Sequence, residues 1–103
     1  MSIRVVIAED QTMLRGALAA LLATEADIEI SGEARDGREA LEMVLRTLPD
    51  VLLTDIEMPE STGLELAAEI KRQRLPVKVV ILTTFARSGY LRRALDSLSL
   101  IHI

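Results

Sequence analysis

The chain alternates between short apolar runs and longer segments that have the period of a helix. Apolar runs rich in β-branched residues occupy positions 3–8, 51–53 and 77–82, and a stretch that alternates apolar and polar residues occupies positions 28–34. Runs of this length, bounded by charged residues and Pro, are typical of strands buried on both faces of a parallel sheet. The pattern therefore predicts four short strands.

The stretch at positions 28–34 has a different pattern from the others. Its polar residues fall at every second position, Glu29, Ser31 and Glu33, with Ile28, Ile30 and Gly32 between them. Strict alternation is the period of a strand with one buried and one wetter face. We expect this strand at an edge of the sheet.

The segment that follows the first strand repeats its apolar residues at helical spacing, which predicts one apolar stripe that packs on the sheet. A second helix follows Asp36 and Glu39, which resemble a capping box, and Pro49 ends it. The positions that define the two faces are Met13, Leu14, Ala17, Leu18, Leu21 and Leu22 in the first helix and Ala40, Leu41, Val44, Leu45 and Leu48 in the second.

A third helix is predicted from the capping pair Thr62 and Glu65 to about Arg72, and a shorter fourth one over residues 88–96. Their periods are marked by Leu64, Ala67, Ala68 and Lys71, and by Leu91, Ala94 and Leu95. Strands that alternate with helices are parallel and joined by right-handed crossovers, so helices should cover both faces of the sheet. We therefore expect a single α/β domain.

The composition narrows the range of functions. The chain has 103 residues, a formal charge of −4 and a pI near 5.0, and this charge argues against direct contact with nucleic acid. It contains no Cys, which excludes disulfides and thiolate metal sites. Because Met1 is followed at once by an apolar, strand-like stretch, we expect no leader sequence. We expect a soluble, cytoplasmic protein with no membrane contact.

Polar residues follow three of the predicted strands. Glu9 and Asp10 close the first strand, Asp55 closes the third, and Thr83 and Thr84 close the fourth. The carboxyl ends of parallel strands lie along one edge, where open α/β sheets bind their ligands. We expect these residues to converge there. The alternative for Asp55 is a turn residue with no functional role, since a single Asp after a strand is also common in turns.

Converging carboxylates repel each other and have raised pKa values unless a cation neutralises them. Oxygen ligands without His or Cys suit a hard ion, and a site with few carboxylates suits Mg²⁺ better than Ca²⁺. A carboxylate beside such an ion can accept a phosphoryl group as a nucleophile. The sequence thus predicts a Mg²⁺-dependent phosphoryl site.

The motifs Glu9-Asp10, Asp55-x-x-Met58-Pro59-x-x-x-Gly63 and Leu82-Thr83-Thr84-Phe85 resemble those of the receiver domains of two-component response regulators. The last motif resembles the LuxR (NarL-like) group of transcriptional regulators. The resemblance covers residues 3–96 and implies a flavodoxin-like three-layer sandwich with a parallel sheet in the order 2-1-3-4. The fifth strand would be missing or replaced by the tail.

The resemblance also implies roles for individual residues. Asp55 would be the phosphoacceptor, and Asp10, Glu9 and the backbone carbonyl of Glu57 would bind Mg²⁺ together with it. Thr83 would be the switch hydroxyl, and Thr84 would lie beside the acyl phosphate. The implied partners are a sensor histidine kinase and, in the intact protein, a second receiver. The domain would be a signalling module and not an enzyme, and it would control a transcriptional output domain.

The resemblance stops after Asp96, so residues 1–96 are expected to form an incomplete receiver and 97–103 a tail. The Lys and the aromatic switch residue that receivers place after this point are missing. Residues 98–103 correspond to one reading frame of a transposon end sequence used as a sequencing adapter. We hypothesise that these residues are not native to the protein. If the genomic locus encodes the same six residues with the same codons, followed by a natural stop codon, the hypothesis is wrong.

Two other functions are compatible with the sequence. A receiver-like interaction domain that has lost phosphorylation would explain the missing Lys. A Mg²⁺-dependent phosphatase with an Asp nucleophile is the enzymatic alternative, but that class uses an Asp-x-Asp pair just after the first strand. This chain has the adjacent pair Glu9-Asp10 at that position.

Overall fold

A computed structural model of the protein describes residues 2–56, 58 and 62–82. Along the chain, the elements are β1 (Ile3–Ala8), α1 (Thr12–Ala23), β2 (Ile28–Ala34), α2 (Gly37–Thr47), β3 (Val51–Asp55), α3 (Gly63–Arg72) and β4 (Lys78–Leu82). Each expected strand and helix up to Leu82 is confirmed, with ends shifted by a few residues at most. The expected helix at 88–96 and the tail lie outside the described residues.

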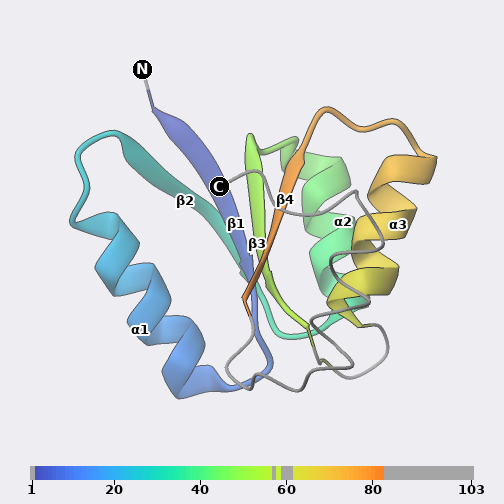
Figure 1. Ribbon diagram of the computed structural model, residues 1–103. Helices are drawn as coiled ribbons and strands as arrows, with labels where there is room; N and C mark the ends of the chain where they lie inside the picture. Colours follow the sequence, from blue (N-terminus) through green and yellow to red (C-terminus); the bar gives the residue numbers. More distant parts are fainter. Residues whose placement is uncertain (1, 57, 59–61, 83–103) are drawn as a thin grey trace.

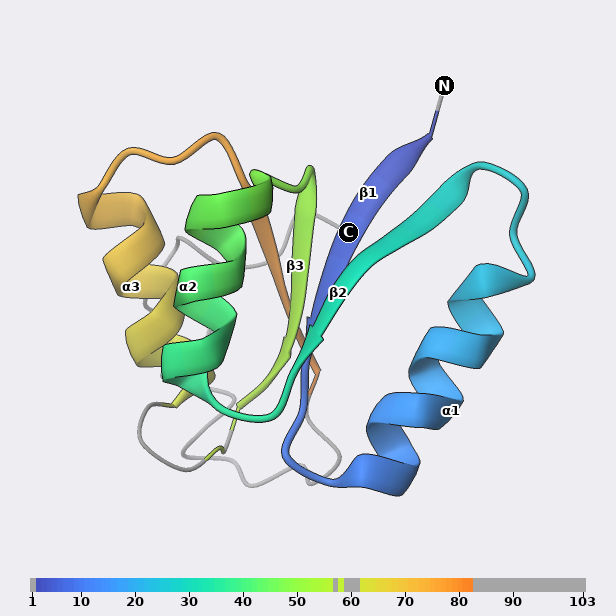
Figure 2. The same cartoon turned by 180° about the vertical axis from the view of Figure 1, so that it is seen from behind.

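The four strands form one parallel sheet in the order β2-β1-β3-β4, as predicted. β2 lies at an edge, which confirms the expectation from its alternating pattern. Helix α1 lies on one face of the sheet, and α2 and α3 lie together on the other (Figure 1; Figure 2 shows the reverse side). The domain is therefore a three-layer α/β sandwich.

The main core lies between the sheet and the pair α2 and α3. It contains Val6 of β1, Leu52 of β3 and Val79 of β4, which are paired across the three strands and are between 0 and 4% exposed. Burying side chains of this size stabilises the fold by roughly 1.5 to 3 kcal/mol each. This layer fixes β1 and β3 side by side, and these strands carry the acids.

One expectation about β2 was wrong. The register between β1 and β2 shifts between Val5 and Val6, where Val5 pairs with Ile30 and Val6 pairs with Gly32. This irregularity moves Gly32 to the face that α2 covers, where an added Cβ would overlap the side chain of Met43. Gly32 therefore does not share a face with Ile30, because a β-bulge inserts an extra residue between them.

The predicted inner faces of α2 and α3 were only partly right. In α2, Ala40 and Val44 are buried as expected, but Leu45 and Leu48 are 46% and 52% exposed. In α3, the buried positions after the first residue are Leu66, Ala67 and Ile70, whereas the predicted Ala68 and Lys71 are exposed. The helix is rotated toward the face that holds its larger apolar side chains, Leu66 and Ile70.

Helix α1 packs against β1 and β2, as predicted, although its apolar stripe is only partly covered. None of its residues is fully buried, and Met13 and Leu21 are 89% and 67% exposed. The partly covered residues include Leu14 and Leu18. Among the described residues of α1, the apolar side chains are therefore divided between a partly covered side and an exposed one.

The two predicted capping pairs both form. The carboxylate of Asp36 accepts from the backbone N–H of Glu39 at the start of α2, while the Glu39 side chain accepts from the N–H of Arg35 and not from that of Asp36. At α3, the Thr62 hydroxyl and the Glu65 side chain make a full reciprocal capping box.

Among the helices in the described ranges, none is both long and apolar enough to cross a membrane.

Candidate functional site

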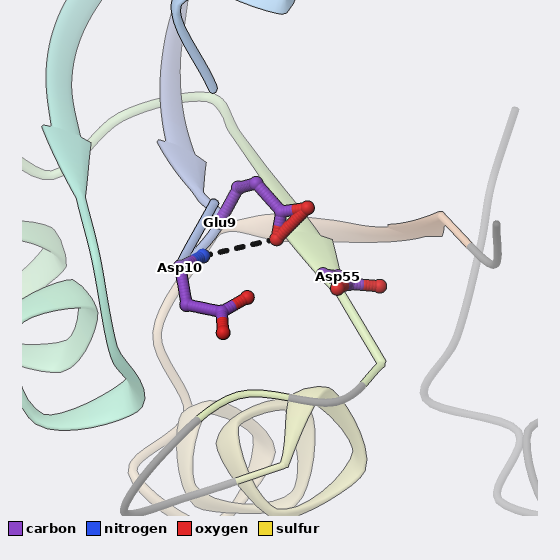
Figure 3. A group of neighbouring side chains, drawn as sticks. All are labelled: Glu9, Asp10 and Asp55. Carbon is purple, nitrogen blue, oxygen red and sulfur yellow. Dashed lines mark hydrogen bonds between the residues drawn. The ribbon is translucent and has the colours of Figure 1, made fainter. Parts of the chain in front are cut away.

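Strands β1 and β3 bring three acids to the carboxyl edge of the sheet. Ala8 pairs with Thr54, so Glu9 and Asp55, the next residues along each chain, emerge side by side, and Asp10 follows Glu9. One carboxylate oxygen from each acid lies within 4.8 Å of the others (Figure 3). The convergence predicted for Glu9, Asp10 and Asp55 is present.

Glu9 is the buried member of this group, with only 2% of its surface exposed. Its pKa is raised from the usual 4.5 to about 7, mainly because burial disfavours the charged form. The negative charge of Asp55 adds to this effect, as do hydrogen bonding to Asp55 and Asp10 and the charge of Asp10. Near neutral pH, the protonated and ionised forms of Glu9 are therefore both populated. A bound cation could replace the proton as the charge that neutralises this carboxylate.

Backbone N–H groups orient two of the carboxylates. The N–H of Asp10 donates to Oε2 of Glu9 over 2.9 Å, and the N–H of Ile56 donates to Oδ1 of Asp55 over 2.8 Å. Asp10 is exposed and Asp55 is half-buried. The group is therefore anchored at the buried end and open to solvent at the Asp10 end.

Behind Asp55, a buried hydroxyl supports the end of β3. The Thr54 side chain is fully buried and donates to the carbonyl oxygen of Asp55 over 3.0 Å. Its oxygen lies 3.8 Å from the sulfur of Met58, which packs in the core. Sequence reasoning missed Thr54, since a Thr within an apolar strand gives no sign that its hydroxyl will reach its neighbour's carbonyl.

Arg15 supports the turn between β1 and α1, and sequence reasoning missed it too. Its Nη1 donates to the carbonyl oxygen of Glu9 over 2.8 Å, and its Nε lies 3.6 Å from Oε1 of Glu33 on β2. The Arg15 side chain is 18% exposed. It therefore ties α1 to the end of β1 that carries Glu9 and Asp10.

We expect Arg15→Gln to lower the free energy of unfolding by about 1.5 to 3 kcal/mol, the range for hydrogen bonds from charged donors. Arg35→Gln is the matched control, because the Arg35 side chain forms an exposed pair with Glu39 and its loss should cost about 0.5 kcal/mol or less. Urea unfolding of both variants measures the difference. Equal losses would show that the Arg15 contact contributes nothing of its own.

A cavity of about 160 Å³ adjoins the acids on the α1 side of the sheet. Glu9 and Asp55 lie at its polar end, and its apolar lining includes Leu14, Leu18 and Leu53. Apolar walls keep water away from one side of the carboxylates, in agreement with the raised pKa of Glu9.

The other predicted site residues, Glu57, Thr83 and Thr84, lie outside the described residues, and their roles stay predictions. Leu82, which precedes Thr83 in the chain, pairs with Asp55 across β3 and β4. The described acids fit a divalent cation, since they offer only oxygen ligands and the cation would offset the repulsion between them. The site could therefore hold a metal ion such as Mg²⁺.

The chain is similar in sequence to known signalling proteins. The response regulator receiver domain family matches residues 5–98. An uncharacterised transcriptional regulatory protein of Bacillus subtilis, YvfU, is 52% identical over 95 residues, which are 92% of this chain and 48% of that protein. The transcriptional regulatory protein DesR of the same species is 50% identical over 95 residues, 92% of this chain and 47% of DesR. The chain thus spans about half the length of these relatives.

A solved structure agrees with the sequence comparison. The LuxR-family DNA-binding response regulator from Staphylococcus aureus superposes with a TM-score of 0.87 at 42% identity, over 92% of this chain and 79% of that one. The expected flavodoxin-like strand order is the one observed. The match ends at residue 98, and the predicted domain boundary at 96 stays a prediction. From the converging acids, the sheet and the family match together, the chain belongs to the response regulator receiver domain family.

Proposed function

We propose that this domain is a phosphoacceptor module in which Asp55 takes a phosphoryl group from the phosphohistidine of a sensor kinase. Glu9, Asp10, Asp55 and the backbone carbonyl of Glu57 would hold Mg²⁺. The observation that carries the proposal is the convergence of three carboxylates, one of them buried, at the edge where β1 and β3 end. The membership of the chain in the receiver domain family supports the same phosphoryl-transfer chemistry.

In the proposed step, a carboxylate oxygen of Asp55 attacks phosphorus, a P–O bond forms, and the P–N bond to the kinase imidazole breaks. The imidazole leaves with the electron pair and takes up a proton. When bound, Mg²⁺ would supply positive charge that offsets the charge on the transferred oxygens. The chain itself orients the nucleophile, since the N–H of Ile56 holds Oδ1 of Asp55.

The residues after β4 have proposed roles in reading this state. The Thr83 hydroxyl would donate to a phosphoryl oxygen and report phosphorylation, and Thr84 would leave room beside the acyl phosphate. The output is proposed to be transcriptional, since the relatives YvfU and DesR are named transcriptional regulators and are about twice as long as the matched region. We place the domain in the cytoplasm and propose that the intact protein pairs through its receivers.

Incubation with acetyl phosphate and MgCl₂, followed by intact mass measurement, tests this function. The proposal expects one phosphoryl group per chain, and omission of Mg²⁺ should prevent its uptake. Continuous release of inorganic phosphate would favour the phosphatase alternative. No adduct, with the fold intact, would favour a receiver-like interaction domain that is not phosphorylated. Transfer from a radiolabelled histidine kinase then tests the partner.

A further inference from the structure

Helix α3 begins in unusually close contact with the end of β3. Gly63 is its first residue, and a Cβ built there would lie well under 3.0 Å from the carbonyl oxygen of Asp55. The same Cβ would be 3.2 Å from the carbonyl carbon of Asp55 and from Cα of Ile56. All three are backbone atoms, which cannot rotate away as the end of a side chain can.

The backbone conformation at Gly63 does not itself require glycine. Its φ is not positive, so an alanine could adopt the same angles. The first turn of a helix also tolerates alanine well. The missing side chain therefore serves the close approach of α3 to Asp55 and Ile56.

This approach completes a short chain of hydrogen bonds that ends on the site. The N–H of Gly63 donates to the carbonyl oxygen of Ile56 over 2.8 Å, and the N–H of Ile56 donates to Oδ1 of Asp55 over 2.8 Å. Ile56 is thus held from both sides, by the helix through its carbonyl and by the carboxylate through its N–H. The orientation of the Asp55 carboxylate depends on where α3 starts.

Two further contacts keep this arrangement rigid. The capping box of Thr62 and Glu65 fixes the first turn of α3, and the buried Thr54 hydroxyl donates to the carbonyl of Asp55. The Asp55 carbonyl oxygen therefore accepts from the Thr54 hydroxyl and also lies in the space that a Cβ at position 63 would need. A group added at position 63 has to move either the helix or the strand end that carries Asp55.

From these contacts we infer that Gly63 is a positioning residue for Asp55. Without a side chain at position 63, the start of α3 can contact the end of β3. Through the hydrogen bonds of Ile56, this contact orients the Asp55 carboxylate toward Glu9 and Asp10. Its consequence for phosphoryl uptake rests on the proposed function. Its consequence for the Ile56 amide does not, since that hydrogen bond joins two groups of the chain itself.

The test compares Gly63→Ala with Gly16→Ala. Gly16 lies within α1, where an added Cβ meets nothing within 4 Å, so this control adds the same methyl group to a helix away from the site. In metal-free protein, Gly63→Ala is expected to shift the Ile56 amide resonance and speed its hydrogen exchange. Gly16→Ala should change neither and should leave the melting temperature equal or higher.

The second readout is Mg²⁺ binding measured by calorimetry. A carboxylate moved by a substantial part of an ångström should weaken binding about tenfold or more in Gly63→Ala, while Gly16→Ala keeps the wild-type affinity. Phosphoryl uptake from acetyl phosphate should slow in parallel. A Gly63→Ala protein that is only less stable, with unchanged Ile56 amide and Mg²⁺ affinity, would overturn the inference.

If Gly63→Ala does not fold, the inference is tested by Thr62→Ala. This change loosens the first turn of α3 without adding an atom beside Asp55, and it should speed exchange of the Ile56 amide. Asp36→Ala is its control, because it removes the equivalent cap from α2, away from Asp55. Equal exchange at Ile56 in the two variants would overturn the inference.

A wild type that takes up neither Mg²⁺ nor phosphate refutes the proposed function alone, and the amide comparison still decides the role of Gly63.

Discussion

The Asp55→Asn protein is expected to remain folded and to take up no phosphoryl group from acetyl phosphate and Mg²⁺. The neutral amide is a poor nucleophile, so the proposed P–O bond cannot form. The fold should survive, because the substitution keeps the shape of the side chain and its Oδ1 can still accept from the N–H of Ile56. Intact mass spectrometry measures the adduct, and circular dichroism confirms the fold.

Asp50→Asn is the matched control for this experiment. Asp50 precedes the same strand, β3, at the opposite edge of the sheet, where its carboxylate accepts from the N–H of Arg4. It should take up one phosphoryl group as the wild type does. An adduct that persists in Asp55→Asn would place the acceptor on another residue and remove the basis of the proposed function.

The stability of the metal-free protein is expected to fall as the pH rises from about 4.5 to 7, because the folded state raises the pKa of Glu9 to about 7. Below pH 4.5, the pKa of Glu9 in the unfolded state, Glu9 is protonated in both states, and the full stabilising contribution of the raised pKa is present. That contribution is lost as the pH passes through the folded pKa. The expected loss is at most about 3 kcal/mol, and urea unfolding at pH 5 and pH 8 measures it.

Glu9→Gln should remove this dependence and make the metal-free protein more stable at pH 8. The amide carries no charge to bury, and its oxygen can still accept from the N–H of Asp10, as the carboxylate does. Glu29→Gln, at an exposed position of β2, is the control and should leave the pH dependence unchanged. A Glu9→Gln protein with the same dependence as the wild type would show that another group is responsible.

Added Mg²⁺ should restore the stability of the wild type at pH 8, because a bound cation replaces the proton as the neutralising charge. Its affinity should decrease as the pH falls below 7, where protons compete for Glu9. Glu9→Gln should bind Mg²⁺ more weakly than the wild type at pH 8, and this difference should shrink as the pH falls below 7 and Glu9 itself becomes neutral. These directions connect the raised pKa of Glu9 to the proposed metal.

The place of the acids in the fold could be predicted from local patterns. An apolar run that ends on Glu9 and Asp10, and another that ends on Asp55, indicate strands by themselves, and parallel strands deliver their carboxyl ends to one edge. The predicted capping residues Asp36 and Thr62 were also correct, because a cap depends on a few neighbouring backbone groups.

The faces of the elements were harder to predict. The helical period of α3 was right and the predicted Ala67 is buried, yet Leu66 and Ile70 are buried beside it and Ala68 and Lys71 are exposed. A period gives the spacing of apolar residues, but the side that faces the core depends on what the helix packs against. In β2, the shift between Val5 and Val6 moved Gly32 to the other face, and a bulge leaves little trace in the sequence.

From the amino-acid sequence alone we could predict the order of strands and helices and the acids that follow β1 and end β3, because these depend on hydrophobic period and on contacts between near neighbours. Only the tertiary structure showed how the acids are held. Arg15 reaches the carbonyl of Glu9, Thr54 supports Asp55, and Gly63 admits the start of α3. These contacts depend on distances between backbones that pack in three dimensions, and neither residue type nor spacing encodes those distances directly.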